Sequence, residues 1–232
     1  MIAISFALPA ESSDLVALLR EKRSIAYGQV ESIQGKIDNR SVEIFHTGVG
    51  RNSCEARIDN FFRAERPQYF IAAGFAGAVR DDLCAGDLIL GKNFSDPTLF
   101  AKANDVLSAC VVKLFTSPVI VDSIAERNEI ARAQGADAVD METEIISQAC
   151  AKRGIPMLSL RVVSDSPRNP FPAPPKVLFN MQLQRTKPTE LLGYLLQHPF
   201  ALWRLIHFGR QVGKARATLA RAIVDLVPAL KL

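Results

Sequence analysis

The feature that most constrains the fold is the regular alternation of apolar runs with amphipathic segments along residues 1–165. Residues 2–8 form an apolar run typical of a strand that is covered on both faces. The segment that follows has the spacing of an amphipathic helix, and similar pairs recur along the chain. Strands and helices alternating at this spacing predict an α/β protein, a three-layer αβα sandwich with a mixed, mostly parallel central sheet.

The boundaries of the expected elements follow from these periods and from the turn residues between them. We expect strands at residues 2–8, 25–33, 42–47, 68–73, 87–90, 136–140 and 156–163. We expect helices at residues 15–22, from the loop 48–50 to Pro67, at 123–134 and at 143–153. Ser12 to Asp14 would cap the first helix, and Ser123 with Glu126 forms a capping box. Residues 74–77 are expected to form a glycine-rich bend.

Length and residue usage exclude several classes of protein. A chain of 232 residues makes one domain or at most two. The longest apolar run, Tyr69 to Val79, is well under the ~18 residues that a membrane-spanning helix needs. The first residues lack a basic leader, so we expect a strand there and a cytoplasmic protein. The four cysteines are widely spaced, without a CxxC pair, and three scattered histidines give no metal-ligand cluster. We therefore expect reduced, mostly buried thiols and no metal.

Charge is distributed unevenly between the body and the tail of the chain. Residues 166–232 hold 10 Lys and Arg against 2 Asp and Glu, whereas residues 1–165 hold 18 against 22. We expect this tail to be a proline-rich linker, Pro167 to Pro175, followed by helix with a break at His198-Pro199. In its last long helix, Leu205, Phe208 and Val212 share one face. The basic and polar residues 204, 207, 211 and 214 share another.

Polar side chains stand at the ends of several expected strands. Ligands of α/β proteins bind at the carboxyl ends of strands, so these positions are the first candidates for a site. Glu11 follows the first strand, Met141 and Glu142 follow another, and Asp165 ends the last. The loop Gly48-Val49-Gly50 precedes a helix and would present backbone N–H groups. The sheet would bring all of these together.

These residues resemble a known enzyme family. The strings AAGFAGAV at 72–79, VDMET at 139–143 and RVVSD at 161–165 follow the pattern of the purine nucleoside phosphorylase and methylthioadenosine/S-adenosylhomocysteine nucleosidase superfamily. The match covers residues 1 to about 165. A short body with a basic helical extension is most similar to the hopanoid-associated phosphorylases.

The resemblance implies cleavage of an N-glycosidic bond to adenine through an oxocarbenium-like sugar. Asp165 matches the general acid that protonates the purine, a role that needs a pKa raised by burial. Its alternative role is an ion pair with Arg161. Glu142 matches the carboxylate that binds the ribose hydroxyls, with Met141 packed against the sugar. Glu11 matches the glutamate that activates water, although the alignment there can slip by one residue.

Further residues match the purine pocket. Phe75, Ala76 and Gly77 would line it, with Phe75 covering the base. Ile120, in the segment 116–121, would lie beside backbone groups that face the purine, and the Gly50 N–H would face an anion or a hydroxyl. Asp140 is expected to cap the helix that follows it and not to contact substrate.

The nucleophile is left open. As we align the glycine bend, the hexameric phosphorylases carry a phosphate-binding arginine where this chain has Ala72, which favours hydrolysis. Arg51, beside a helix N-terminus, offers an alternative anion site. No cofactor is expected, and inorganic phosphate is the alternative co-substrate.

The composition of the tail, residues 166–232, indicates what kind of substrate and partners the protein would have. A basic amphipathic helix carrying Phe200, Trp203 and Phe208 would lie at the inner face of a membrane or cover a pocket for an apolar 5′ substituent. Either role fits a lipid-linked nucleoside such as adenosylhopane. The alternatives are a helix packed on the acidic body or on a partner subunit, since the family implies a homo-oligomer. Nucleic-acid binding is not expected, because the basic residues are sparse and no aromatic platform accompanies them. Two rival functions stay open, a soluble methylthioadenosine/S-adenosylhomocysteine nucleosidase and a catalytically silent nucleoside- or lipid-binding protein.

Overall fold

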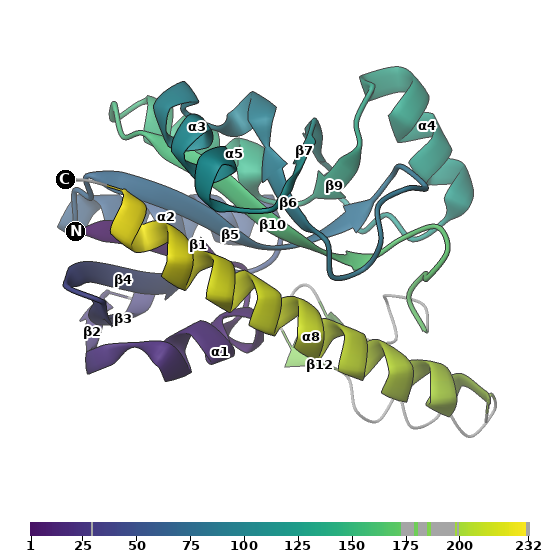
Figure 1. The fold of residues 1–232 in the computed structure, drawn as a ribbon, viewed down its shortest axis with the longest axis horizontal. Helices are drawn as coiled ribbons and strands as arrows, with labels where there is room; N and C mark the ends of the chain where they lie inside the picture. The colour runs from purple at the N-terminus through teal and green to yellow at the C-terminus, as the bar shows by residue number, and fades with distance from the viewer. Residues whose placement is uncertain (29, 173–178, 181–184, 187–197, 199, 231–232) are drawn as a thin grey trace.

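One mixed sheet forms the centre of the computed structural model, which describes residues 1–28, 30–172, 179–180, 185–186, 198 and 200–230. Strand β1 pairs in parallel with β4 and β5, and β5 pairs in parallel with β10 (Figure 1). Along its main path the strand order is β2 (Arg20–Tyr27), β3 (Val30–Ile37), β4 (Arg40–His46), β1 (Ile2–Phe6), β5 (Tyr69–Ala78), β10 (Met157–Asp165), β6 (Leu88–Gly91) and β7 (Cys110–Val112). Two short strands extend it beside β5, namely β9 (Ala138–Asp140) and β8 (Leu114–Thr116).

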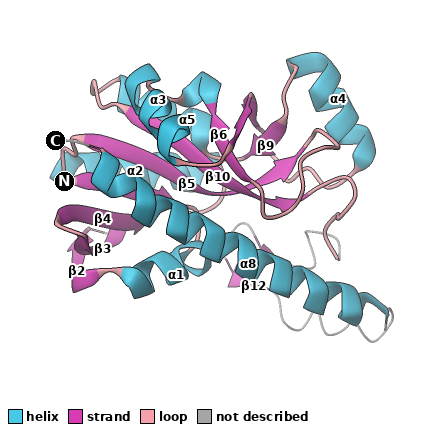
Figure 2. Cartoon of the chain, viewed as in Figure 1, coloured by secondary structure: helices cyan, strands magenta, loops and turns pink. Residues whose placement is uncertain are grey.

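Helices cover both faces of this sheet (Figure 2), which confirms the predicted αβα sandwich. The helices α1 (Pro9–Leu18), α3 (Pro97–Val106) and α8 (Phe200–Ala229) bury apolar side chains against one face. The helices α2 (Arg51–Ala64) and α5 (Thr143–Ala151) do so against the other. Alternate residues of β1 serve the two cores, Ile2 and Ile4 on one side and Ala3 on the other, as the pleat requires. A further helix, α4 (Ile124–Gln134), begins at the predicted capping box.

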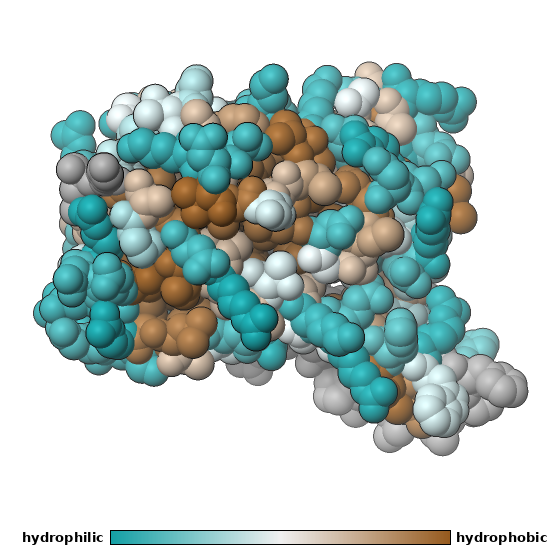
Figure 3. Space-filling model, viewed as in Figure 1, coloured by the Kyte–Doolittle hydropathy of each residue, from teal (hydrophilic) through white to brown (hydrophobic). Residues whose placement is uncertain are grey.

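Helix α8 has two differing halves. Its second half crosses the sheet beside α1 and α3, and Leu219, Ile223 and Leu226 are buried in the core. Its first half projects past the end of the sheet (Figure 1) and shows both hydrophobic and hydrophilic surface (Figure 3). No helix in the described part of the chain is long and apolar enough to cross a membrane.

The predicted first helix is wrong in position. Helix α1 begins at Pro9 and ends at Leu18. Proline suits the first turn because it has no N–H, and an N–H there would have no acceptor within the helix. Ser12 and Ser13 do not cap it. Their hydroxyls donate back to the carbonyls of Pro9 and Ala10. The shift places Glu11 in the first turn of the helix, directly after β1.

Other boundaries also differ from the prediction. The expected strand at 25–33 is two strands of a meander, because β2 and β3 turn at Gly28, which has a φ of +61°. The expected bend at 74–77 is continuous strand within β5. The stretch 91–122 contains α3, which starts at the cap residue Asp96. The expected helix before residue 198 is contradicted by the pair β11 (Phe179–Asn180) and β12 (Arg185–Thr186). The rest of residues 173–197 and the break at Pro199 lie outside the described residues.

Candidate active site

A cavity of about 520 Å³ opens at the carboxyl ends of β1, β5, β9 and β10. It contains most of the residues predicted as a site, which five separate segments of the chain supply. The predicted residues that line it are Glu11, Phe75, Ala76, Gly77, Ile120, Met141, Glu142 and Asp165. Gly50 is not among the lining residues. Its N–H donates to Glu142 Oε1 at 2.8 Å. The glycine loop thus holds a carboxylate in place.

Two buried glutamates face this cavity from different elements. Glu11 comes from the first turn of α1 and Glu142 from the junction of β9 and α5. Burial, and then the charge of Glu142, raise the pKa of Glu11 to about 8. Glu11 Oε2 accepts no hydrogen bond from any residue that the structure describes. The pKa of Glu142 is also raised, first by burial and then by Asp140, but the Gly50 N–H favours its charged form. Glu11 is therefore the more basic of the two carboxylates.

A buried arginine lies behind these glutamates. The Arg161 guanidinium forms an ion pair with Asp140 at 2.8 Å and donates to the Thr143 hydroxyl and the Ala73 carbonyl. Asp140 also accepts from the Thr143 N–H, the first of α5, although the residue at the N-cap position is Glu142. Asp140 lines the cavity as well, so the expectation that it would stay away from the site is not supported. Gly74, at φ +147°, makes this packing possible, since a Cβ there would lie 2.5 Å from Arg161 Nη1.

Asp165 pairs with a residue that the sequence did not single out. Its partner is Arg127 of α4, only 1% exposed, and not Arg161 as the alternative had it. Arg127 also donates to the carbonyls of Ala78 and Val121, which fixes its position. The Ser164 hydroxyl donates to Asp165 Oδ1 at 2.6 Å. Burial raises the pKa of Asp165, while Arg127 and Ser164 act in the opposite direction.

Glycine at position 77 gives room for this pair. A Cβ on Gly77 would lie 3.1 Å from Asp165 Oδ2 and 3.2 Å from Arg127 Nη1, tighter than ordinary contact. One sequence signal points to Arg127. It lies three and four residues before Ile130 and Ala131, so it is on the face of α4 that packs against the core.

The rest of the cavity wall is apolar. It includes Val119, Val121 and Phe171 and, from α8, Leu205, Phe208 and Val212. Phe171 and Phe208 are in contact, with ring centroids 5.6 Å apart. Gln211 of α8 donates to the carbonyl of Ser164, which ties the helix to the strand end that carries Asp165. The helical extension is therefore part of the cavity.

The remaining predicted groups are Arg51, Ala72, the cysteines and possible metal ligands. Arg51 forms an exposed ion pair with Glu55 and does not line the cavity, and Ala72 is buried within β5. All four cysteines are free. Cys54 and Cys150 are buried as expected, whereas Cys84 and Cys110 are exposed, contrary to expectation. No cluster of possible metal ligands occurs among the described residues.

Comparison with known proteins finds a family match and curated relatives. Residues 96–196 match the family model described as the phosphorylase superfamily. The 5′-methylthioadenosine/S-adenosylhomocysteine nucleosidase of Actinobacillus succinogenes is 25% identical over 199 residues, covering 71% of this chain and 85% of the relative.

Solved structures share the fold over 99% of this chain. The Neisseria meningitidis 5′-methylthioadenosine/S-adenosylhomocysteine nucleosidase in complex with methylthio-immucillin-A has a TM-score of 0.73 at 17% identity, with 99% of its chain covered. The futalosine hydrolase of Helicobacter pylori has a TM-score of 0.75 at 17% identity, with 97% covered. The resemblance predicted from the motifs is thus supported by a family match over residues 96–196, by relatives at 25% identity and by a shared fold.

Proposed function

We propose that this protein is an enzyme that cleaves the N-glycosidic bond of a 5′-substituted adenosine and releases adenine. One observation carries the proposal: a buried acid with a raised pKa, Asp165, lines the same cavity as the buried glutamates Glu11 and Glu142. Relatives and structural neighbours named as nucleosidases or as a futalosine hydrolase support this reaction class.

The chemistry of these groups suits that reaction. As the bond from C1′ to N9 breaks, its electron pair goes to the purine, and Asp165 gives N7 a proton so that adenine leaves neutral. Glu142 accepts hydrogen bonds from the ribose hydroxyls, and its charge stabilises the sugar as it becomes cationic. Glu11 takes a proton from the attacking water while the water oxygen bonds to C1′. A carboxylate with a pKa near 8 is a stronger base than an ordinary glutamate. Inorganic phosphate in place of water is the alternative.

For the 5′ substituent we propose an apolar, lipid-linked group such as the hopanoid of adenosylhopane. Leu205, Phe208 and Val212 of α8 support this choice, because an alkyl group gains free energy by leaving water for an apolar wall. A small thioether, as in methylthioadenosine, is the alternative, and the named relatives support it. A lipid-linked substrate requires contact with a membrane, which we assign to the projecting half of α8.

Adenine release measured by chromatography tests the proposal. The protein is incubated with adenosylhopane and with methylthioadenosine, each with and without inorganic phosphate. Adenine from adenosylhopane alone supports the lipid-linked substrate, and adenine from methylthioadenosine alone supports the small-thioether alternative. A sugar 1-phosphate formed only when phosphate is present would identify a phosphorylase.

The variant Asp165→Asn separates an enzyme from a silent binder. Asparagine keeps the shape but cannot give N7 a proton, so adenine release should fall by about 10²–10⁴-fold. Asp82→Asn, an exposed aspartate paired with Arg80, is the matched control and should keep full activity. The enzymatic function would be refuted if the unaltered protein released no adenine from any nucleoside and bound nucleosides as tightly as Asp165→Asn does. That result would favour a silent nucleoside-binding protein.

A further inference from the structure

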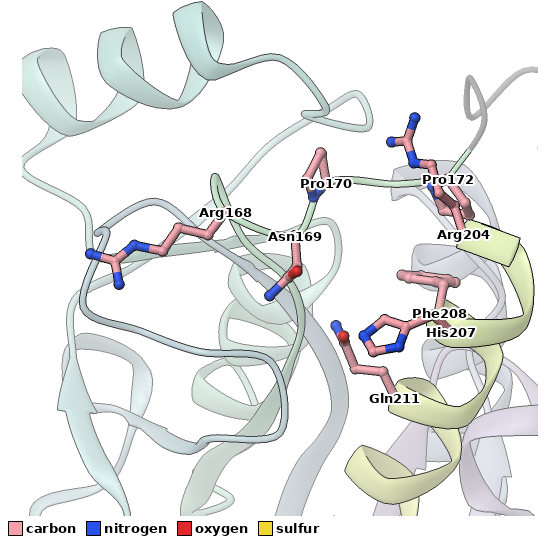
Figure 4. A pocket seen from close by; sticks show the side chains of 8 residues that line it. All are labelled: Arg168, Asn169, Pro170, Pro172, Arg204, His207, Phe208 and Gln211. Carbon is pink, nitrogen blue, oxygen red and sulfur yellow. The ribbon is translucent and has the colours of Figure 1, made fainter. Parts of the chain in front are cut away.

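A second pocket, of about 290 Å³, lies between residues 168–172 and the first turns of α8 (Figure 4). Phe208 lines both this pocket and the catalytic cavity, so the two spaces are neighbours. Asn169 reaches it from the loop after β10, and His207 and Gln211 reach it from α8, with their polar ends toward one another (Figure 4). The substrates named for the relatives do not indicate what this pocket binds.

The polar groups of this pocket suit an oxyanion. Its described lining includes the basic side chains of Arg168, Arg204 and His207 and the amides of Asn169 and Gln211, and none of these residues is acidic. One Arg204 nitrogen donates to the Phe171 carbonyl at 3.4 Å, and the guanidinium has further N–H groups for a ligand. Arg168 contributes charge at a greater distance, since its guanidinium points away from His207 (Figure 4). Guanidinium and amide donors are the groups that bind phosphate oxygens.

Large apolar side chains are exposed on the same turns of α8. Trp203 is 76% exposed, Leu202 48% and Ile206 42%. They lie on one side of the helix, because positions 202 and 206, and 203 and 206, are one turn apart. A helix with exposed tryptophan and aliphatic residues beside arginines is typical of one that lies in the headgroup region of a bilayer.

We propose that this pocket binds the phosphate of an anionic phospholipid headgroup, while Leu202, Trp203 and Ile206 enter the headgroup region. The basic lining of the pocket and the apolar side chains beside it both suit an anionic phospholipid bilayer. In this arrangement the catalytic cavity, which shares Phe208 with the pocket, lies next to the bilayer that would hold a lipid-linked substrate. That last consequence rests on the proposed function, whereas headgroup binding itself does not.

The fluorescence of Trp203 tests the proposal directly, because it is the chain's only tryptophan. The full-length protein is titrated, without nucleoside, with vesicles of phosphatidylcholine alone or of phosphatidylcholine with phosphatidylglycerol. We expect a blue shift of the emission with the anionic vesicles and none with the neutral ones. We expect Arg204→Gln to weaken this binding by roughly 10–100-fold, as the loss of a hydrogen bond to a charged group does.

Arg210→Gln is the matched control, since Arg210 is exposed on the same half of α8 and does not line the pocket. Attraction between charges without a site contributes roughly fivefold per basic residue near the surface. Equal losses for Arg204→Gln and Arg210→Gln would therefore overturn the proposal. So would the absence of a blue shift in the unaltered protein with anionic vesicles.

Inorganic phosphate alone, followed by calorimetry, distinguishes a lipid headgroup from a free anion. We expect inorganic phosphate to show no saturable binding that depends on Arg204. Phosphate binding that Arg204→Gln abolishes, without a blue shift on vesicles, would assign the pocket to free phosphate and overturn the headgroup. The variant Asp165→Asn should bind vesicles as the unaltered protein does, because vesicle binding needs no catalysis. A protein that binds vesicles but releases no adenine would refute the proposed function and leave the headgroup site standing.

Discussion

The two ends of the catalytic cavity are built in different ways. At one end, charged residues follow the ends of β1, β9 and β10. Those after β9 and β10 are held by buried hydrogen bonds or ion pairs, whereas Glu11 Oε2, after β1, has no partner among the described residues. At the other end, the wall is apolar and belongs to α8 and to Phe171 after the last long strand. Pairing offsets the free-energy cost of burying these polar groups at the sheet end. The α8 end is held by packing and by the bond from Gln211 to Ser164.

This difference suggests a division of labour. A residue at the sheet end acts on the bond that breaks, so its loss should slow every substrate by the same factor. A residue at the α8 end contacts the 5′ group alone, so its loss should alter the preference between substrates. The predictions below test this assignment of separate roles to the two ends of the cavity.

The largest effect is expected at the sheet end, for Glu11→Gln. Glutamine cannot accept a proton from water, so kcat should fall by about 10²–10⁴-fold for all substrates alike. The unaltered enzyme should gain activity as pH rises toward 8, because Glu11 must lose its proton to act as a base. Steady-state kinetics across pH measure both. An unchanged kcat, or a loss confined to one substrate, would remove Glu11 from the chemistry.

Protein stability gives an independent check on Glu11. At a pH between its unfolded and folded pKa values, a carboxyl with a raised pKa is protonated in the folded state but not in the unfolded state. The free energy of unfolding therefore falls as pH rises from about 4.5 to about 8. Glu11→Gln should make this decline shallower, and Glu142 and Asp165, whose pKa values burial also raises, contribute to what remains. Chemical denaturation at several pH values measures the slope, and the exposed Glu55→Gln should leave it unchanged.

The sheet end is also where prediction from sequence succeeded most. Asp165 ends a strand that runs parallel to β5, so its place at the carboxyl end of the sheet follows from the pattern. Glu142 follows β9, which runs antiparallel to β5, so its place in the same cavity depends on the fold. Glu11 was placed correctly in space although its helix was predicted six residues too late, because Pro9 starts that helix. Arg127 escaped prediction, since its partner lies 38 residues away and only the fold brings α4 to the end of β10.

An intermediate effect is expected for Arg127→Met, which removes the partner of Asp165. Where Asp165 is charged, its buried carboxylate would be left unpaired, so the free energy of unfolding at high pH should fall by about 3–5 kcal/mol. The pKa of Asp165 should rise further, because Arg127 lowers it, and the decline of kcat/KM at high pH should move to higher pH. Denaturant titration and a pH profile measure these changes.

Two further variants test whether Arg127 acts through its charge. Arg127→Lys keeps the charge without the forked geometry, so it should recover part of the stability and bring the pH profile back. Arg132→Met, an exposed arginine on the same helix, should alter neither. If Arg127→Met folds and shows the unaltered pH profile, Arg127 has a structural role only.

The α8 end was less predictable, for a physical reason. The helical period showed that Leu205, Phe208 and Val212 share a face, but many surfaces can cover such a face. A membrane, a pocket for the 5′ substituent, a partner subunit and the acidic body were all open. In the structure these three residues line the cavity, which agrees with the pocket-covering alternative. The choice depends on contacts with the loop after β10, such as that between Phe171 and Phe208, which no local pattern encodes.

The smallest effect is expected at this end, for Phe208→Ala, and it tests the division most sharply. A long alkyl group would lose its contact with the ring, whereas a 5′-methylthio group is too short to depend on it. The kcat/KM for 5′-octylthioadenosine should fall by about tenfold, as expected for lost apolar contact, and that for methylthioadenosine should change little. Leu202→Ala, on the exposed side of the helix, should leave the ratio unaltered with these soluble substrates. Equal losses for both nucleosides would mean that α8 supports the reacting end instead. The helix would then act on catalysis through Gln211 and Ser164, and substrate preference would have to come from Val119 and Phe171.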